Sequence, residues 1–303
     1  MTGEERSLVL VTEATPRVGA GHAMRLATLG AAWAGLGPVR ALGPIDLPFV
    51  RDRFARLNIP LGGPPPGPGE IVVVDSYDPS TRFRWSHAPA PALRVLVDDH
   101  GGVSVPLDYD CVWNPNAYAD RSIYPSFSGT VLAGREYLAI REDLPRWEAR
   151  PDGDIFVSLG GGQPSPTVAA AFGLLDEFNL PVRFAYSGDW GPTGWRQVAP
   201  HRFWTEAAGA RHLITAAGIT VWEAAVVGIP VVLLMTADNQ RDTYRWCRDA
   251  GVPGTNTLLA DAEFLAHQLA ALIAVAGRLP AVQSGTGRVV EILTRLAAES
   301  GQL

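Results

Sequence analysis

Cysteine is scarce in this sequence, which has only two among its 303 residues, Cys111 and Cys247. They lie in different halves of the chain and form no CxxC pair, which argues against a disulfide framework and a zinc site. We therefore expect two buried thiols and no metal.

Long apolar runs and excess positive charge are also missing. Apolar runs such as Ile229 to Met235 are far shorter than the roughly 18 residues that cross a bilayer. The first six residues are too acidic for a secretory signal, so we expect no membrane span and a cytoplasmic location.

With 25 Lys plus Arg against 31 Asp plus Glu, the net charge of -6 argues against nucleic acid as the main partner. A phosphorylated small molecule stays compatible, because a helix N-terminus and a few donors suffice to bind it.

The sequence contains no GxSxG, HExxH or P-loop motif, so three common catalytic classes find no support. What it does contain is 47% hydrophobic and 18% charged residues, a composition typical of globular proteins. Its length predicts two domains, at about 150 residues each.

Short apolar runs alternate with helical stretches in both halves, which is typical of an α/β fold with a parallel sheet. The charged, proline-containing segment 141–154 separates the halves. We place an N-terminal Rossmann-like domain at 1–145 and a C-terminal one at 146–303, each doubly wound. The stretch HRFWTE (201–206) is among the predicted strands, and two amphipathic helices are predicted near the C-terminus.

Each half has a glycine-rich turn after its first strand. In the first, RVGAGHAMR (17–25) places His22 at the start of a helix, and in the second, SLGGGQPSP (158–166) repeats the arrangement. Glycines let a ligand approach the backbone and helix N–H groups attract phosphate, but a purely structural turn explains each motif equally well. No third glycine follows at Rossmann spacing, so a dinucleotide fingerprint is not supported.

The segment TAAGITVWEAAVVGIP (215–230) carries Glu223 one turn into a short helix. A carboxylate there can accept hydrogen bonds from a ribose diol, while the N–H groups near Gly218 can hold a diphosphate. The alternative for Glu223 is a solvated helix residue. Asn239 and Gln240 start the next helix, where capping by Asp238 or Asn239 is the simpler explanation.

Polar residues also end two strands of the first half, where Asp98, Asp99 and His100 invite a metal interpretation. Adjacent strand residues point to opposite sides, which argues against one coherent site. Aromatic residues of this half are candidates for an acceptor pocket, although core packing or surface placement explains them more simply. They are Trp85, Trp113 and Tyr118.

The ordered set GAGHAMR, VVDSYD, VDDH, WNPNAYAD, LAGREYLAIRED, SLGGGQ, TAAGITVWEAAVVGIP and DNQ resembles the PseG family, from about Val11 to Gly251. That family comprises nucleotide-sugar hydrolases of pseudaminic acid biosynthesis, and related spore-coat polysaccharide (SpsG-like) proteins share the pattern. The resemblance implies a GT-B fold, with two Rossmann-like domains facing a central cleft. It further implies release of a nucleoside diphosphate, UDP in the family, as water attacks the anomeric carbon with inversion.

The resemblance also implies roles for single residues. His22 matches a histidine regarded as catalytic, Tyr77 matches a tyrosine suited to orienting water, and Glu223 matches a glutamate that binds ribose. The assigned residues are, for catalysis, His22, Tyr77 and Asn239; for the nucleotide and its phosphates, Gly161, Gly162, Gly218, Ile219, Thr220 and Glu223; and for the sugar, Gly21, Arg25, Asn239 and Gln240.

Two departures from the family pattern lie near the expected cleft. Gln163 and Pro164 follow the second glycine pair where the family has Thr-Asp or Ser-Asp, and Ser76 replaces a histidine before the tyrosine. The sequence thus leaves three functions open: a hydrolase, a glycosyltransferase to a small acceptor, and a non-catalytic nucleotide-sugar-binding domain. In each the partner is a nucleoside-diphosphate sugar, no cofactor is expected, and the chain is a monomer or weak dimer.

Overall fold

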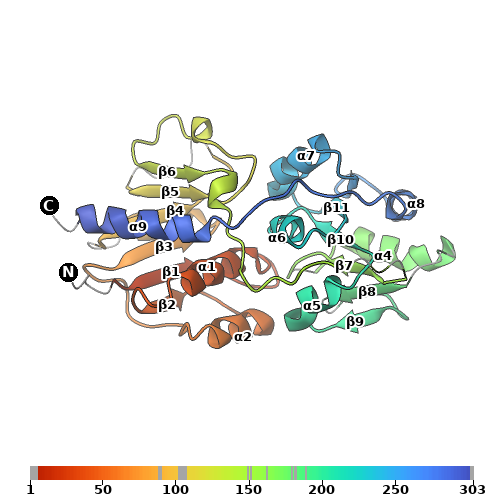
Figure 1. Cartoon of the computed structure of the whole chain (residues 1–303), viewed down its shortest axis with the longest axis horizontal. Helices are drawn as coiled ribbons and strands as arrows, with labels where there is room; N and C mark the ends of the chain where they lie inside the picture. The colour runs from red at the N-terminus through yellow and green to blue at the C-terminus, as the bar shows by residue number, and fades with distance from the viewer. Residues whose placement is uncertain are drawn as a thin grey trace. The chain divides into compact units, whose positions relative to one another are not determined.

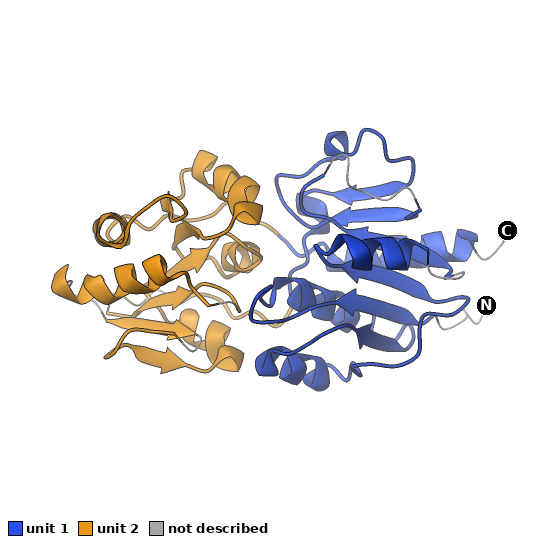
Figure 2. Cartoon of the chain, turned by 180° about the vertical axis from the view of Figure 1, so that it is seen from behind, with its two compact units in different colours: residues 1–141, 283–303 blue, residues 142–282 orange. Residues whose placement is uncertain are grey.

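The structure is a computed structural model that describes residues 6–87, 91–101, 108–148, 150, 152–161, 163–178, 180, 183–187 and 190–300. The chain divides into two compact units, residues 1–141 with 283–303 and residues 142–282 (Figure 2). Each unit contains a six-stranded parallel sheet with helices packed on it, as the alternating pattern predicts.

The first unit has the strand order β2-β1-β3-β4-β5-β6, with every neighbouring pair parallel (Figure 1). Its strands are β1 (Leu8–Thr12), β2 (Val39–Leu42), β3 (Ile71–Asp75), β4 (Leu93–Val97), β5 (Cys111–Asn114) and β6 (Thr130–Ala133). Its helices are α1 (Gly21–Ala32), α2 (Pro48–Arg56), α3 (Pro79–Ser86) and α9 (Thr286–Ser300), with the short 3-10 turns η1 (Arg121–Ile123) and η2 (Arg135–Tyr137).

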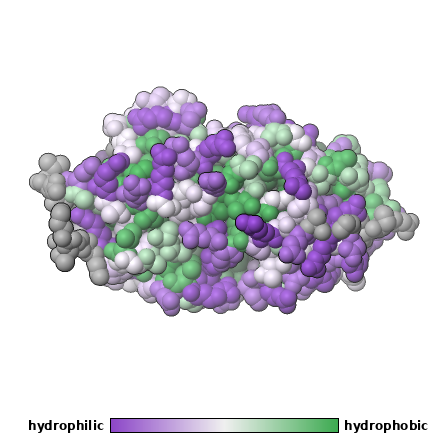
Figure 3. All heavy atoms as spheres, in the orientation of Figure 1, coloured by the Kyte–Doolittle hydropathy of each residue, from purple (hydrophilic) through white to green (hydrophobic). Residues whose placement is uncertain are grey.

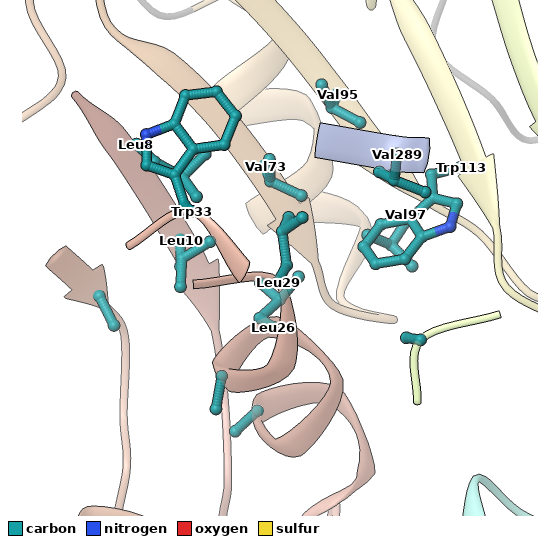
Figure 4. Packing of buried hydrophobic residues seen from close by; sticks show 14 of the residues in the cluster. Leu8, Leu10, Leu26, Leu29, Trp33, Val73, Val95, Val97, Trp113 and Val289 are labelled. Atoms are coloured by element: carbon teal, nitrogen blue, oxygen red, sulfur yellow. The ribbon is translucent and has the colours of Figure 1, made fainter. Parts of the chain in front are cut away.

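The inner strands of this sheet, β1, β3, β4 and β5, are buried on both faces, whereas the edge strands β2 and β6 are largely half-buried. The side chains of the inner strands alternate between two cores. Leu8 and Leu10 of β1 pack with Leu26 and Leu29 of α1 in one core (Figure 4). Val9 of β1 faces the other core. Because the side-chain period of a strand is two, residues that follow a strand continue this alternation and meet different helices. This parity determines which polar side chains come together at the strand ends.

The C-terminal helix α9 belongs to the first unit, not to the second domain where the sequence boundary at 145 places it. Its apolar stripe, with Val289 and Leu293 fully buried, packs beside α1 over the first sheet (Figure 4). The amphipathic pattern of residues 286–300 predicts a helix with one buried face, but a helical period carries no information on which core that face joins.

The second unit has the strand order β12-β11-β10-β7-β8-β9, again all parallel. Its strands are β7 (Ile155–Ser158), β8 (Phe184–Ser187), β9 (Arg196–Val198), β10 (His212–Ala216), β11 (Val231–Met235) and β12 (Gly254–Asn256). Its helices are α4 (Pro166–Leu174), α5 (Phe203–Ala207), α6 (Thr220–Val227), α7 (Arg241–Asp249) and α8 (Ala262–Ile273), with the 3-10 turns η3 (Leu175–Phe178), η4 (Pro200–Arg202) and η5 (Asp238–Gln240).

The predicted strand at 201–206 is wrong, because this stretch forms η4 and α5. Its aromatic content suggested a strand, but Pro200 opens a helical turn and Trp204 is buried as a helix residue, only 5% exposed. The edge strands β9 and β12 have three residues each and no apolar run, so periodicity did not reveal them.

Both thiols are buried, as the sequence predicts, and burial raises the pKa of Cys111 and of Cys247. Within the described ranges, no helix has the length and apolar character needed to cross a membrane. On the face drawn in Figure 3, hydrophilic side chains are interspersed with hydrophobic ones.

His212, the first residue of β10, is a buried histidine whose Nε2 has no hydrogen-bond partner in the described structure. Burial, aided by the charge of Arg211, lowers its pKa from 6.5 to about 4. Between pH 6.5 and pH 4, His212 binds a proton in the unfolded chain but not in the folded chain. The free energy of unfolding therefore falls as the pH falls from 6.5 toward 4.

We expect the free energy of unfolding of the second unit to drop by about 2 kcal/mol between pH 7 and pH 5 through this residue alone. His212→Leu should remove that part of the pH dependence in urea titrations at the two pH values. The exposed His201 supplies a matched control, since His201→Leu should leave the slope with pH unchanged. An equal slope in wild type and His212→Leu would contradict the assignment.

Candidate active site

His22 lies at the start of α1, where its imidazole meets the last residue of β3. Its Nδ1 lies 2.5 Å from Oδ1 of Asp75, and the two residues are 6% and 0% exposed. Burial raises the pKa of Asp75, but the positive charge of Arg25 outweighs that effect and holds the pKa below its ordinary value. An ionised carboxylate can only accept, so Nδ1 of His22 donates to Asp75, and in the neutral imidazole of that tautomer Nε2 is the acceptor. No residue in the described part of the chain bonds to that Nε2.

Arg25 follows His22 by one helical turn and joins two buried carboxylates. Its guanidinium donates to both oxygens of Asp75, with 2.7 Å from Nη2 to Oδ1, and to both oxygens of Asp99, at 2.7 and 2.9 Å. Burial would lower the pKa of Arg25, but Asp75 and Asp99 raise it, so the side chain stays charged. The predicted role of Arg25 at the sugar would therefore be indirect.

Asp99 collects further donors from two loops. Tyr77 donates its hydroxyl to Oδ2 at 2.6 Å, and Asn116 donates to Oδ1 at 2.8 Å. Tyr118 donates to the backbone carbonyl of Asp99 at 2.7 Å. Burial alone would raise the pKa of Asp99, but Arg25 and the hydroxyl of Tyr77 outweigh that effect and hold the pKa well below its ordinary value. The carboxyl group therefore stays ionised.

The neighbouring Asp98 faces the opposite side of the sheet and bonds to other residues, although Tyr124, Asn114 and Asn116 link it to Asp99 through successive hydrogen bonds. Its carboxylate accepts from Arg82 at 3.2 Å, from Tyr124 at 3.0 Å and from the amide of Gly101 at 2.7 Å. The alternation of side chains along a strand separates the two aspartates, as the sequence predicts. Among the described residues, no group of three or more His, Cys, Asp or Glu side chains is arranged to hold a metal ion.

The polar cluster of the first unit consists of side chains from the start of α1 and from the ends of the neighbouring strands β3, β4 and β5. It comprises His22, Arg25, Asp75, Tyr77, Asp99, Asn116 and Tyr118. With His22 neutral the cluster carries one net negative charge, two carboxylates against one guanidinium.

Of the sequence-assigned residues in this unit, His22, Tyr77 and Arg25 come together, and Gly21 opens α1 with open space around its Cα. The assignment missed Asp75, Asp99 and Asn116. The alternation of side chains along the strands could have identified the two aspartates. Asp75 and Asp99 each fall on the side of their strand that packs against α1, where Arg25 lies.

Two of the three aromatic candidates for an acceptor pocket are core residues. Trp113 is fully buried and donates its Nε1 to the carbonyl of Tyr137 at 2.8 Å, and Trp85 is only 9% exposed. The half-buried Tyr118 alone lies at the polar cluster.

In the second unit, the assigned glycines follow β7 and β10, the two central neighbouring strands. Gly160 has a φ of +85°, which favours glycine, and side-chain-sized space at Gly160 and Gly218 is open. Gly161 is half-buried beside it, while Gly162 lies outside the described residues.

The first turn of α6 offers donors at its start. The amide of Gly218 is engaged by the carbonyl of Ala216 at 2.8 Å, which differs from the expectation that it holds phosphate. The amides of Ile219 and Thr220 donate to no acceptor in the described ranges, and no side chain caps this helix. These two N–H groups are therefore the donors that a phosphate would meet.

Glu223 is half-buried on α6, and its Oε2 accepts from Nε1 of Trp204 at 2.9 Å. This bond fixes the carboxylate, so the alternative of a freely solvated helix residue does not apply.

Asn239 and Gln240 lie in η5 just after β11. Oε1 of Gln240 accepts from the amide of Thr236 at 2.8 Å, and Asp238 pairs with Arg241. Neither Asp238 nor Asn239 caps α7, whose N-cap is Gln240 with no side-chain bond, so the simpler explanation by capping is wrong.

No protein-family model and no curated protein matches this chain. Solved structures do resemble it along nearly its whole length. The proposed UDP-N-acetylglucosamine 2-epimerase of Listeria monocytogenes aligns with a TM-score of 0.62 at 12% identity, covering 97% of both chains. The spinosyn rhamnosyltransferase SpnG in complex with thymidine diphosphate aligns at 0.56 and 16%, covering 97% of this chain and 96% of that one.

MurG of Acinetobacter baumannii aligns with a TM-score of 0.52 at 15% identity, covering 95% of this chain and 99% of that one. The chain has the GT-B fold. At these identities the likeness establishes the fold alone, and because these GT-B neighbours include an epimerase and transferases, the chemistry of this chain must be argued from its own residues.

Proposed function

We propose that this chain is a nucleoside-diphosphate-sugar hydrolase of the PseG and SpsG-like type, with His22 as general base. The observation that carries the proposal is the buried His22–Asp75 pair, which leaves Nε2 of His22 as an acceptor at the carboxyl edge of a parallel sheet. Ligands of doubly wound folds bind at this edge. The first unit would supply the base and the second the nucleotide site.

In the proposed reaction a water oxygen attacks the anomeric carbon as Nε2 of His22 takes the water proton. The bond from that carbon to the diphosphate oxygen breaks with its electron pair on the leaving diphosphate, and the sugar is released with inverted configuration. The negative charge of Asp75 and Asp99 stabilises the imidazolium that forms, beyond what Arg25 neutralises.

The second unit supports the leaving group through its backbone. The amides of Ile219 and Thr220 would meet the charge that grows on the diphosphate, aided by the dipole of α6. The chain has no lysine, because all 25 of its basic residues are arginine. A mechanism through a lysine Schiff base is therefore excluded.

One of the two departures from the family pattern, Ser76, takes part in a hydrogen bond. Ser76, which replaces the family histidine, donates its hydroxyl to Oε1 of Glu13 at 2.6 Å. This serine–glutamate pair lies next to Asp75 in the chain, so the sugar that this chain accepts would differ from the family's at that side.

The test is release of nucleoside diphosphate from a panel of UDP-, dTDP-, GDP- and CMP-linked sugars, with and without candidate alcohol acceptors. Release without acceptor, with ¹⁸O from labelled water in the sugar, supports the hydrolase. Release that requires an acceptor makes the chain a glycosyltransferase, and binding without release makes it a non-catalytic nucleotide-sugar-binding protein. Both of those outcomes overturn the proposal.

Glu223→Ala should raise KM by about 10- to 100-fold with little change in kcat, because a charged hydrogen bond to ribose is worth about 1.5–3 kcal/mol. Glu223→Gln, which keeps an acceptor oxygen near Nε1 of Trp204, should give an intermediate KM. Initial rates over a range of nucleotide-sugar concentrations measure both constants. An unchanged KM in the alanine variant would remove Glu223 from the nucleotide site.

A further inference from the structure

Asp99 differs from every other carboxylate described in this chain in the number of segments that it holds together. We propose that Asp99 is the positioning residue of the site, which keeps Tyr77 against the imidazole of His22 and, through Arg25, keeps Asp75 on Nδ1. This inference rests on the proposed role of His22 as the base, and it assigns to Asp99 no contact with substrate.

The carboxylate of Asp99 has no acceptor position left for a ligand. Oδ1 accepts from Nη1 of Arg25 and from Asn116, and Oδ2 accepts from Nη2 of Arg25 and from the hydroxyl of Tyr77. These four bonds fill the roughly four lone-pair positions of a carboxylate. A group so saturated and only 6% exposed can orient its neighbours, but it is poorly placed to take a proton from substrate.

Tyr77 transmits this constraint to the base. Its ring meets the imidazole of His22 edge to face, with centroids 4.4 Å apart and planes at 83°. The hydroxyl bond to Asp99 fixes the tilt of that ring, and the bond to Asp75 fixes the other side of the imidazole. Because the hydroxyl proton of Tyr77 is directed at Asp99, its ring rather than its hydroxyl is the part that acts on His22. This contact with the base would act beside the water-orienting role that the family resemblance implies for Tyr77.

Arg25 carries the second connection. It bonds to both oxygens of Asp99 and of Asp75, so the position of one carboxylate determines the position of the other. Loss of the charge at position 99 would free Arg25 to shift toward Asp75. The Nδ1–H of His22 would then compete with a guanidinium for the same oxygen, since Nη2 of Arg25 already lies 2.7 Å from Oδ1.

The adjacent Asp98 is a control, because it is also a buried, hydrogen-bonded carboxylate but faces Arg82 and Tyr124 instead. Asp98→Asn should affect stability and leave His22 unchanged. Tyr124→Phe removes the hydroxyl that donates to Asp98 and accepts from Asn114, and it serves where Asp98→Asn does not fold.

The experiment compares Asp99→Asn and Asp98→Asn in the full chain by two measurements. The first is ¹⁵N NMR of histidine-labelled protein without substrate, which reports the tautomer of His22. Wild type should show a protonated Nδ1 and an unprotonated Nε2, and Asp99→Asn should shift His22 toward a mixture of tautomers. Tyr77→Phe, which lacks the hydroxyl, should move the same signals in the same direction and serves if Asp99→Asn does not fold.

The second measurement is steady-state kinetics, in which Asp99→Asn should lower kcat by about 10²-fold, the cost of a misplaced reacting group, with KM within about twofold. Wild-type tautomer signals in Asp99→Asn, or equal changes in Asp98→Asn, would overturn the inference. The NMR result stands apart from catalysis. If no nucleotide sugar is turned over but the tautomer shifts, then the proposed function fails while the positioning role of Asp99 holds.

Discussion

His22→Ala should lower kcat by about 10²- to 10⁴-fold, the usual contribution of a general base. The side chain is held by Asp75 at Nδ1 and by the ring of Tyr77, so its loss removes the base without replacing it. Nucleotide-sugar binding should persist, because the expected nucleotide donors lie on α6 in the other unit. Single-turnover rates, together with the dissociation constant of the nucleotide sugar, measure the two effects separately.

Two further variants make this prediction specific. Asp75→Asn keeps the size of the side chain but no longer selects the Nδ1–H tautomer of His22. Its kcat should therefore fall by a large part of the factor expected for His22→Ala. His267→Ala is the control, because His267 is exposed on α8, where it bonds to the carbonyl of Glu263 and its ring contacts Phe178. Near-normal turnover by His22→Ala would remove this histidine from the mechanism.

The sequence predicts the two-unit α/β fold because parallel strands buried on both faces appear as short apolar runs. The runs that form β1, β3, β7 and β11 are of this kind, and all five residues of β1 are buried. Segments decided by long-range contacts were not predictable in this way. Helix α9 returns to the first sheet across the whole second unit, and no local pattern encodes that return.

The candidate site was predictable in part for a related reason. His22 stands out beside its glycines, and strand-end carboxylates are visible in the sequence, yet their partners depend on which helix covers each face. Alternation along β4 predicts that Asp98 and Asp99 point to opposite faces of the sheet. Only the structure shows that Arg25 lies on the same face as Asp99 and bonds to it. A buried arginine that joins two carboxylates is a tertiary feature, and the local pattern from which Arg25 is assigned to the sugar carries no sign of it.

Arg25→Met should destabilise the first unit by about 3–5 kcal/mol, the typical cost of leaving a buried ion pair without one partner. The substitution keeps much of the aliphatic volume, so the loss comes mainly from the two carboxylates of Asp75 and Asp99, which are 0% and 6% exposed. Urea unfolding at pH 7 measures the difference. Arg295→Met is the matched control, because Arg295 is exposed and its contact with Glu299 is 4.0 Å long, so its removal should cost well under about 1 kcal/mol.

The pH dependence of this loss has a definite sign. In wild type the pKa values of Asp75 and Asp99 are lowered below their ordinary values, so their ionised forms favour the folded state above about pH 4. That stabilisation is lost as pH falls below the ordinary aspartate range, because the unfolded chain then binds protons that the folded chain does not. In Arg25→Met the lowering disappears, so the gap in unfolding free energy between wild type and variant should be largest at pH 7 and should narrow toward pH 3. A gap that stays constant over this range would mean that Arg25 stabilises the unit through packing and not through the charges of Asp75 and Asp99.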